Sequence, residues 1–369
     1  MRVLFHCRES LGNFQGGDAV QILATKRSLE GLGIEVMISS RPDPDVSGFD
    51  LLHIFNPVLV SWRGLEAAKR AGIPVVISPI YWPMGDYFQA YRGLAATYLR
   101  ERPAGWLGGA GQSLIRYLGY TYGWNPHLRR SLRDFLKQAD GLLPNSRAEA
   151  GVINSDLGVM RPTFVIPNGV SEQPHQPKST NLPSELARLD SYVLCVGRLE
   201  LRKNQHLLIS ALRDLAVPLV LVGNDQVDPS YTALCQQLGR QRGQTYFFPA
   251  QTSVSLAAVY QRARVHALPS WYETPGLASL EAAAAGARIV TTAVGGSEEY
   301  FGQEAWYCDP RQPDSIKQAV KKALATPPSK ILHQRVQREF TWTEAARATL
   351  VAYHSVLGKQ TQSKSAKKG

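Results

Sequence analysis

Cysteine is scarce in this sequence, with only four among 369 residues. Cys7, Cys195, Cys235 and Cys308 are widely separated, and no pair of them has the short spacing of a metal site. Cys7 and Cys195 lie inside apolar runs that are typical of strands, which favours reduced thiols that pack in a core. The pattern therefore predicts neither a disulfide framework nor a zinc site, and we expect no metal at the functional site.

Long hydrophobic runs are missing as well. Apolar stretches such as Pro218–Val222 have the length of a strand. They fall far short of the roughly 20 residues that cross a bilayer. Arg2 and Arg8 leave only a short apolar stretch between them near the N-terminus, which argues against a secretory signal peptide. We expect a cytoplasmic protein, with peripheral attachment to the inner face of the membrane as a further hypothesis.

Acidic residues are outnumbered, since 30 Asp and Glu stand against 41 Lys and Arg, which gives a formal net charge of +11. Such a charge suits nucleic acid, an anionic membrane face or phosphorylated substrates. Residues 86–137 hold eight basic and three acidic residues with Tyr and Trp between them, so they form either a solvated face or a membrane-docking surface. No helix-turn-helix, finger or RNA-binding signature is present, which argues against nucleic acid as a partner.

Apolar residues, in contrast, are plentiful at 44%, enough to bury a sizeable core. Short apolar runs alternate with stretches of helical period, a pattern typical of parallel strands joined by crossover helices. The length suits two domains of about 150 residues each. We therefore predict an α/β fold in which two doubly wound, Rossmann-like domains face each other across a cleft, with ligands at the carboxyl ends of the strands.

The predicted first domain, residues 1–170, has strands at 2–7, 35–40, 50–55, 74–78, 141–144 and 163–167. Residues 81–124 are rich in aromatic residues and glycine, and we interpret them as an inserted basic and aromatic lobe. Residues 171–190 contain three prolines and no periodicity, which indicates a linker.

The predicted second domain, residues 191–342, has strands at 192–196, 219–222, 245–248, 265–268, 288–292 and 306–308. A helix at 343–357 is expected to return to the first domain. Residues 358–369 are polar and basic, and we expect them to form a disordered tail.

The first candidate site is a basic loop in the second domain. A predicted strand ends at Gly197, and the next residues include Arg198, Arg202 and Lys203, followed by Asn204 as a plausible helix N-cap. Cationic side chains at a strand-to-helix turn meet phosphate oxygens directly. The loop is therefore either an anion site or a solvated basic loop.

The second candidate site is a helix start later in the same domain. Glu273 precedes this helix, and the amides of Gly276, Leu277 and Ala278 would lie in its unpaired first turn, where they can cradle a phosphate. Glu281 lies inside the helix among apolar neighbours. It either meets a polar partner in a mostly buried position or faces solvent.

A glycine-rich loop, residues 12–19, follows the first predicted strand and contains Gly16 and Gly17. Its backbone could approach a phosphate closely. The loop matches neither the dinucleotide fingerprint nor a P-loop, so it is a weak signal by itself.

Together these segments resemble the retaining glycosyltransferases of family four, which have the GT-B fold. The resemblance covers nearly the whole chain. Its motifs are Gly16-Gly17, the run Val-Ile-Pro-Asn-Gly-Val at 165–170, Gly197-Arg198 with Lys203-Asn204, and the pair Glu273 and Glu281, which are separated by seven residues.

The resemblance implies a role for each matching residue. Arg198 and Lys203 would neutralise the donor diphosphate, Glu273 would contact hydroxyls of the transferred sugar, and Glu281 would hold the two ribose hydroxyls. The leaving phosphate would help to remove the acceptor proton on the same face, so that the anomeric configuration is kept. The implied catalytic residues are Glu273, Arg198 and Lys203, and the implied donor-binding residues are Gly16, Gly17, Gly276, Leu277, Ala278 and Glu281.

We thus expect transfer of a hexosyl sugar from a UDP- or GDP-linked donor to a glycan, lipid-linked or small-molecule acceptor, without a metal or other cofactor. Many relatives carry a histidine at the end of the fourth strand, but residues 78–83 have none, so no catalytic histidine is assigned. One alternative is an epimerase or phosphorylase on the same fold, although neither an acid/base pair nor a pyridoxal lysine is evident. The other alternative is a non-catalytic nucleotide- or membrane-binding protein.

Overall fold

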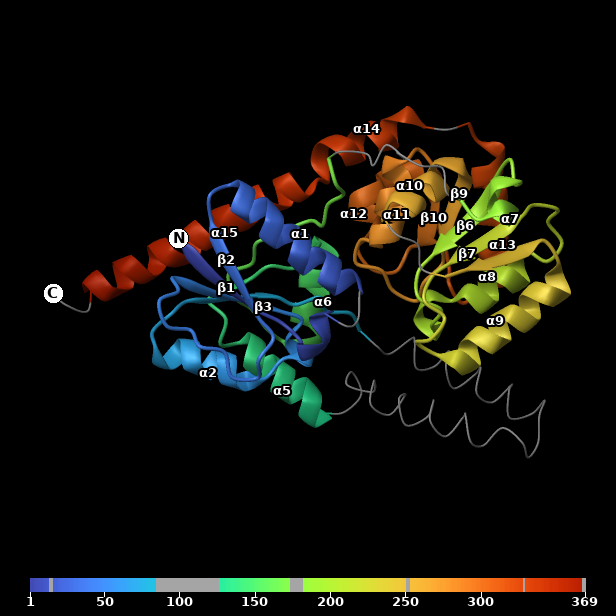
Figure 1. The fold of residues 1–369 in the computed structure, drawn as a ribbon. Coiled ribbons are helices and arrows are strands. Elements are labelled where there is room, and N and C mark those ends of the chain that lie inside the picture. Colours follow the sequence, from blue (N-terminus) through green and yellow to red (C-terminus); the bar gives the residue numbers. More distant parts are fainter. Residues whose placement is uncertain (13–15, 84–125, 173–181, 250–252, 328, 367–369) are drawn as a thin grey trace. The chain divides into compact units, whose positions relative to one another are not determined.

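The computed structural model describes residues 1–12, 16–83, 126–172, 182–249, 253–327 and 329–366 (Figure 1). The chain divides into two compact units. The first unit combines Met1–Trp82, Asn125–Glu172 and Glu339–Gly369, and the second includes Gln173–Arg338. The expected lobe at 81–124 lies, apart from its first three residues, outside the described ranges. Among the described helices, none combines the length and apolar character needed to cross a membrane.

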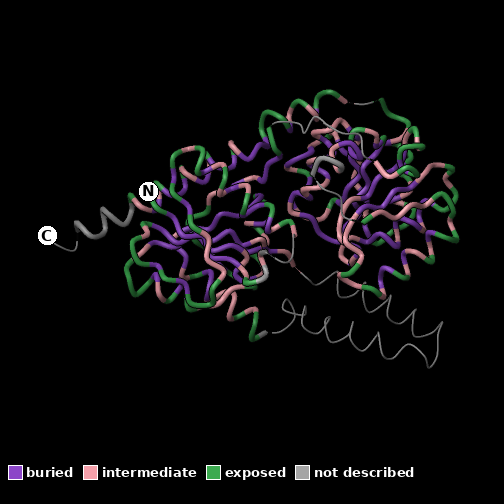
Figure 2. Tube along the Cα trace, viewed as in Figure 1, coloured by how far each residue is buried: buried purple, intermediate pink, exposed green. Residues whose placement is uncertain are grey.

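The first unit contains a five-stranded parallel sheet in the order β2-β1-β3-β4-β5. Its strands are β1 Arg2–His6, β2 Glu35–Ser39, β3 Leu51–Phe55, β4 Val75–Ser78 and β5 Gly141–Leu142. Its helices are α1 Gly17–Gly31, α2 Trp62–Arg70, α5 Pro126–Leu136, α6 Arg147–Leu157 and α15 Trp342–Ala366. Every residue of β3 and β4 is buried, which explains their continuous apolar character (Figure 2).

The prediction of a strand at 163–167 is wrong. Thr163 forms only an isolated bridge with Leu142, after which the amides of Phe164 and Ile166 donate to Leu142 and Pro144. Strand β5 itself has only two residues, and Pro144, which lacks an amide hydrogen, follows closely. The segment therefore runs beside β5 without extending the sheet as a regular strand.

Helix α15 returns to the first unit, as predicted, and packs against α1. His53 on β3 links it to the sheet: its Nδ1 lies 2.6 Å from the Tyr353 hydroxyl and its Nε2 lies 2.9 Å from Ser78 Oγ. The helix continues to Ala366, so the prediction that 358–369 is a disordered tail is wrong for 358–366. Lys, Gln and Ala are good helix formers, and extending an anchored helix costs far less than nucleating one.

The second unit contains a six-stranded parallel sheet, and all six predicted strands are present. They are β6 Tyr192–Val196, β7 Leu219–Val222, β8 Thr245–Phe248, β9 Ala263–Leu268, β10 Arg288–Thr292 and β11 Ala305–Cys308. Their order is β11-β10-β9-β6-β7-β8, so the chain starts at the centre and the direction of winding reverses between β6 and β9. This order defines a doubly wound Rossmann-like sheet.

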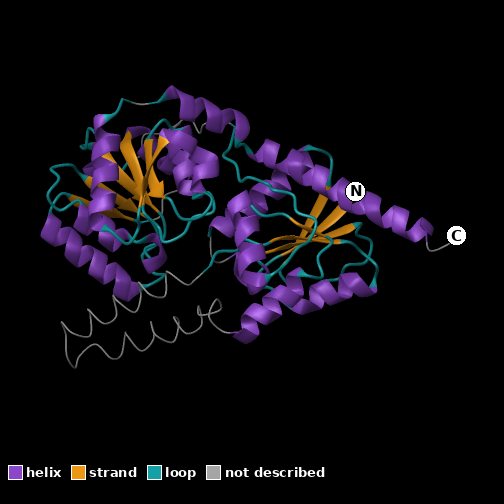
Figure 3. Cartoon of the chain, turned by 180° about the vertical axis from the view of Figure 1, so that it is seen from behind, coloured by secondary structure: helices purple, strands orange, loops and turns teal. Residues whose placement is uncertain are grey.

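Helices surround the strands of the second sheet (Figure 3). They are α7 Ser184–Ala187, α8 Gln205–Ala211, α9 Pro229–Arg242, α10 Ser253–Arg262, α11 Leu277–Ala284, α12 Ser297–Phe301, α13 Pro313–Ala325 and α14 Lys330–Glu339. The single turn α7 lies within the predicted linker. The core of this unit includes Cys195, Cys235 and Cys308, which confirms that these thiols pack as small apolar residues.

Candidate functional site

Both candidate segments of the second unit follow strands at the switch point of its sheet. The basic loop comes after β6, and the loop that carries Glu273 comes after β9, its neighbour in the sheet. In doubly wound sheets, ligands bind outside the carboxyl ends of the strands at the place where the winding reverses. The fold therefore brings together residues 70 positions apart in the sequence at the expected ligand position.

The basic loop folds into a 3-10 turn, Leu201–Lys203, before α8 begins. Asn204 occupies the predicted N-cap position, but the prediction that its side chain caps the helix is wrong. Its backbone is left-handed, with a φ of 62°, and its buried Nδ2 donates to the carbonyls of Pro269 and Pro310 at 3.0 and 2.8 Å. Asn204 thereby ties the basic loop to the chain that follows β9.

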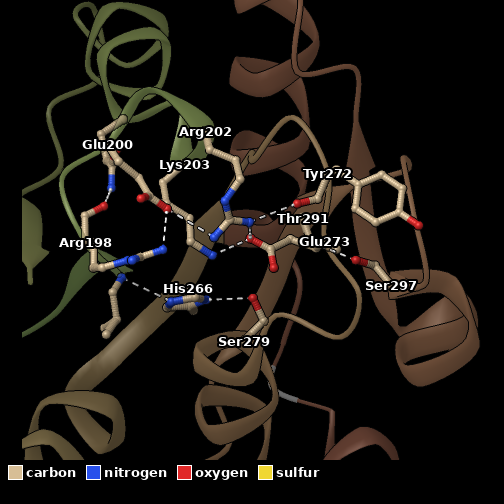
Figure 4. A network of polar contacts seen from close by, with 12 residues as sticks. Arg198, Glu200, Arg202, Lys203, His266, Tyr272, Glu273, Ser279, Thr291 and Ser297 are labelled. Atoms are coloured by element: carbon tan, nitrogen blue, oxygen red, sulfur yellow. Dashed lines mark hydrogen bonds and ion pairs between the residues drawn. The ribbon is translucent and has the colours of Figure 1, made fainter. Parts of the chain in front are cut away.

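Three cations and two carboxylates form one network at this site (Figure 4). The Glu200 carboxylate accepts from Arg198 and Arg202, with N–O distances of 3.1 Å in both cases. The Lys203 ammonium lies 2.6 Å from the Glu273 carboxylate, and Arg202 lies 3.8 Å from the same oxygen. The structure thus assembles three predicted residues, Arg198, Lys203 and Glu273, and adds Glu200 as a bridge.

The backbone of Glu273 is held by a bridge to the loop after β10. Its amide donates to the Val294 carbonyl at 3.2 Å, and its carbonyl accepts from Gly296 at 2.8 Å. Gly295 between them has a φ of +107°, and a Cβ there would lie 2.1 Å from the Glu273 carbonyl oxygen. Glycine is therefore required at this position, because any side chain would push the Glu273 backbone away.

The Glu273 side chain is only 5% exposed. Burial by itself would raise the pKa of its carboxyl, but Lys203 and Arg202 outweigh burial and hold the pKa below its ordinary value. Glu273 is thus a buried, charged carboxylate with two cationic neighbours. Such a group can orient a polar substrate and favour positive charge that develops nearby.

Helix α11 starts beside this carboxylate. Its N-cap, Gly276, has a left-handed backbone, and the Gly276 carbonyl accepts from the amides of Ser279 and Leu280 at 2.8 and 3.0 Å. The amides of Leu277 and Ala278 come before these first intrahelical donors, as predicted for a phosphate cradle. A Cβ at Gly276 would lie 3.5 Å from Glu273 Oε2, so the helix start and the carboxylate are adjacent.

Glu281 is half-buried on α11, one of the two arrangements expected from the sequence. Its Oε2 accepts a hydrogen bond of 2.9 Å from the Tyr260 hydroxyl on α10. Burial raises the pKa of this carboxyl, and the bond from Tyr260 offsets only part of that effect. The two glutamates of the motif therefore lie in opposite electrostatic surroundings.

His266 on β9 is a buried member of the site that the sequence analysis missed. Its Nε2 accepts from the Val196 amide at 3.3 Å, and its Nδ1 lies 3.3 Å from Ser279 Oγ. Burial lowers the pKa of the ring to about 3, so the ring is neutral with the proton on Nδ1. It joins the ends of β6 and β9 to the first turn of α11. A single histidine in an apolar run carries no sequence signal for this role.

Gly16 and Gly17 belong to the first unit, where they form the N-cap and first residue of α1. Beside them, Arg8 and Asp18 form an ion pair of 2.7 Å whose side chains are only 11% and 13% exposed. A Cβ on Gly16 would lie 2.7 Å from the Asp18 carboxylate, so a larger residue would disturb this pair. The middle of the glycine-rich loop, residues 13–15, lies outside the described ranges.

A doubly wound domain with convergent cations at its switch point is typical of proteins that bind nucleotides or phosphates. Comparison with known proteins identifies the family. The family described as "Glycosyl transferases group 1" matches residues 182–339. A D-inositol 3-phosphate glycosyltransferase from Mycobacteroides abscessus is 30% identical over 315 residues, which are 76% of this chain and 70% of that protein. The chain belongs to the group 1 glycosyl transferases.

Other similarities agree with this family. A glycogen synthase from Mycobacterium tuberculosis is 29% identical over 272 residues, or 68% of this chain, and the match spans 60% of that protein's length. Sucrose-phosphate synthase from Thermosynechococcus elongatus superposes with a TM-score of 0.75 at 18% identity, covering 97% of this chain and 99% of that one. Anabaena HepE in complex with UDP-glucose gives 0.62 at 16% identity, with 99% and 100% covered. The solved structures confirm the GT-B fold.

Proposed function

We propose that the protein transfers a hexosyl sugar from a nucleoside diphosphate donor to a glycan, lipid-linked or small-molecule acceptor, with retention of configuration. The observation that supports this most strongly is the cluster of Arg198, Arg202 and Lys203 around Glu273 at the switch point of the second sheet. The names of the relatives, a glycogen synthase and inositol phosphate glycosyltransferases, point to the same chemistry. The HepE complex with UDP-glucose suggests UDP-sugars as the first donors to test.

In this proposal the cations stabilise the leaving diphosphate. Departure of a diphosphate concentrates negative charge on its oxygens, and preorganised cations in a partly buried site lower the energy of that state. Arg198 and Lys203 would neutralise this charge, and the amides of Leu277 and Ala278 would add hydrogen bonds at the start of α11. The family resemblance implies that Gly17 would also donate a hydrogen bond to the diphosphate.

The two carboxylates would bind different parts of the donor. Glu273, beside the cations, would face the sugar and orient its hydroxyls while positive character develops at the anomeric carbon. Glu281 would accept from the ribose hydroxyls further along α11. A leaving phosphate oxygen would take the acceptor proton on the face from which the phosphate departs, which keeps the configuration without a basic side chain of the enzyme.

The test is a panel of UDP- and GDP-sugars, measured first by thermal shift and then by transfer to acceptors. A donor at 100 times its dissociation constant stabilises the protein by about 2.7 kcal/mol. We expect one nucleotide class to stabilise the chain. The sugar should appear on an acceptor with the anomeric configuration that it had in the donor, and free nucleoside diphosphate should be the second product. Absence of binding for every nucleotide would contradict the proposal, and binding without turnover would favour a non-catalytic protein.

Peripheral attachment to an anionic membrane is a further part of the proposal. Most of the basic segment 86–137 lies outside the described residues, but its last part forms α5, which carries Arg129, Arg130 and Arg133. Each basic residue near an anionic surface contributes about 1 kcal/mol, so several suffice for reversible binding. Co-sedimentation with anionic vesicles but not with neutral ones is expected. Equal binding to both, or to neither, would exclude the idea.

A further inference from the structure

The basic loop contains an anion of its own. Glu200 lies between Arg198 and Arg202 in the sequence, and its Oε1 accepts from an Nη2 of each at 3.1 Å (Figure 4). The Glu200 side chain is 15% exposed and that of Arg198 is 33% exposed. The most exposed cation of the site is therefore occupied by a carboxylate of the same loop.

Glu200 is charged in this position. Burial would raise the pKa of its carboxyl, but Arg202, Arg198 and Lys203 together hold the pKa below its ordinary value. The site then contains three positive and two negative side chains. A bound diphosphate brings further negative charge, so Glu200 opposes the ligand that the cations attract.

The two arginines differ in how they are anchored. Arg202 also reaches the segment after β9, because it donates to the Tyr272 carbonyl at 3.4 Å and its own carbonyl accepts from the Trp271 amide at 3.0 Å. Arg198 pairs with Glu200 at the more exposed side of the network. Arg198 can therefore exchange its partner without a change in the fold of the loop.

We propose that Glu200 is an internal stand-in for a diphosphate oxygen: it holds Arg198 in the empty site, yields this guanidinium to the diphosphate on binding, and takes it back on product release. This inference rests on the proposed function. It makes Glu200 a positioning residue that limits affinity for the nucleoside diphosphate and shortens the lifetime of the product complex.

A purely structural role for Glu200 predicts the opposite change in diphosphate affinity when the carboxylate is removed. If the carboxylate served only to hold the arginines in place for the phosphates, its removal would weaken binding. If it competes with the phosphates, its removal strengthens binding, and more so for ligands of higher charge. The turn itself does not depend on the carboxylate, because the Lys203 amide donates to the Glu200 backbone carbonyl at 2.9 Å.

The experiment is calorimetric titration of wild type and Glu200→Gln with UDP, GDP and ADP, followed by the monophosphate and nucleoside of the base that binds best. We expect Glu200→Gln to bind the diphosphate roughly ten-fold tighter at low salt, because a neutral amide holds Arg198 less tightly than the carboxylate does and yields it to the phosphates more easily. The gain should shrink for the monophosphate, vanish for the nucleoside and fall with added salt.

Two further variants make the result specific. Asp214→Asn removes an acid of the same unit whose carboxylate lies 2.9 Å from Lys317, and it should leave diphosphate binding unchanged. In an Arg198→Ala background, Glu200→Gln should lose most of its effect, because the exchanging cation is absent. Thermal unfolding without ligand verifies that each variant is folded.

Equal or weaker diphosphate binding by folded Glu200→Gln would overturn the inference while leaving the proposed function intact. An equal gain in Asp214→Asn, or a full gain without Arg198, would also overturn it. If wild type bound none of the three diphosphates, the proposed function and this inference would fail together.

Discussion

Glu273 and Glu281 lie eight positions apart and have the same carboxyl group, yet their surroundings shift the two pKa values in opposite directions. Two cations hold the pKa of Glu273 below its usual range, whereas burial raises that of Glu281, whose partner is the Tyr260 hydroxyl. The first environment suits a group that acts on developing charge, and the second suits a hydrogen-bond acceptor for neutral hydroxyls. Substitutions of the two residues should therefore change different kinetic parameters.

Glu281→Ala should chiefly raise the donor KM. The ribose does not change as the sugar departs, so its hydrogen bonds contribute equally to the ground state and the transition state. A hydrogen bond to a charged group is worth about 1.5–3 kcal/mol, which corresponds to a loss of roughly ten- to a hundred-fold. Steady-state kinetics with varied donor measure this effect. A large fall in kcat at unchanged KM would place Glu281 at the reacting centre instead.

Glu273→Gln should chiefly lower kcat, by about 10²–10³-fold if Glu273 resembles other preorganised electrostatic groups. The amide keeps the shape of the side chain but removes the charge that faces Lys203. Because the substitution leaves the half-buried cations Arg202 and Lys203 with less compensating negative charge, thermal unfolding must accompany the kinetics. If Glu273→Gln only weakened donor binding while Glu281→Ala slowed turnover, the donor would lie in the reversed orientation.

Activity should persist without a divalent metal. In the proposed function, Arg198 and Lys203 would supply the positive charge that a metal ion supplies at other diphosphate sites. Turnover in excess EDTA should match turnover with added Mg²⁺ or Mn²⁺, while Arg198→Ala should reduce kcat and raise KM in both buffers. Complete loss in EDTA with recovery on adding metal would contradict the proposal.

The sequence pattern indicates four charged residues of the site, but neither Glu200 nor the pairing of the charges. Arg198, Lys203 and Glu273 follow strand ends in the pattern and Glu281 lies in the helix after Glu273, so their neighbourhood could be inferred. Glu200 is visible in the sequence as an acid within a run of basic residues. Its pairing with Arg198 and Arg202 could not be inferred, because that pairing depends on the directions of side chains around a 3-10 turn. Tyr260 lies in a separate helix and gave no signal, because only the tertiary fold brings its hydroxyl to Glu281.

At the scale of elements, the end of β4 carries backbone strain. Ile80 has a φ of +49°, which is costly for a β-branched residue. The fully buried Glu149 on α6 holds the turn, since its carboxyl accepts from the amides of Tyr81 and Asn145 at 2.7 Å each. This segment, residues 78–83, contains no histidine, and the buried carboxyl of Glu149 fixes its backbone.

Glu149→Gln should cost more stability at pH 5 than at pH 8. Burial raises the pKa of the Glu149 carboxyl to about 7 from an ordinary value of 4.5, although its backbone hydrogen bonds act in the other direction. Between these values the folded state binds a proton that the unfolded state does not, so this contribution to stability is present at low pH and is lost as pH rises through about 7. The cost of the substitution should therefore grow by up to about 1.4 kcal/mol per pH unit on acidification.

Urea unfolding between pH 5 and 8 measures this cost. Glu66→Gln, which removes an exposed acid on α2, is the matched control and should show no such trend. An ion-paired carboxylate would give the reverse dependence. A larger cost at pH 8 than at pH 5 would therefore show that Glu149 is charged and stabilised in the folded protein.

The predictability of an element depended on what its buried face contains. The strands were found because their apolar runs are continuous, as expected for parallel strands covered on both faces. Helix α6 gives a weak helical pattern in the sequence because its buried positions are Glu149, Ile153 and Leu157, so a carboxyl interrupts the apolar stripe. Helix α14 buries only Leu332 and Val336, four positions apart, so its apolar stripe is short.

At the scale of the whole molecule, the chain leaves the first unit, builds the second, and returns. Val170 and Thr341 form a parallel bridge where the outgoing and returning segments meet within the first unit. Gly169 is required there, because a Cβ would lie 2.2 Å from the Thr341 backbone. The first unit is therefore built from residues that precede and follow the second unit in the sequence, even though each unit has its own sheet.

Tyr353→Phe should weaken the first unit alone. Tyr353 is fully buried on α15, and its hydroxyl lies 2.6 Å from Nδ1 of the buried His53. The substitution removes the hydroxyl and leaves this nitrogen without that partner. An unsatisfied buried group costs about 1–3 kcal/mol. Hydrogen exchange measured by mass spectrometry should show faster exchange in β1, β3 and β4 and unchanged exchange in β6, β7 and β9. Val351 lies on the same helix and is 65% exposed, so Val351→Ala should leave hydrogen exchange in both sheets unchanged. Faster exchange confined to the second sheet would mean that α15 stabilises the unit it follows in the sequence rather than the unit it packs on.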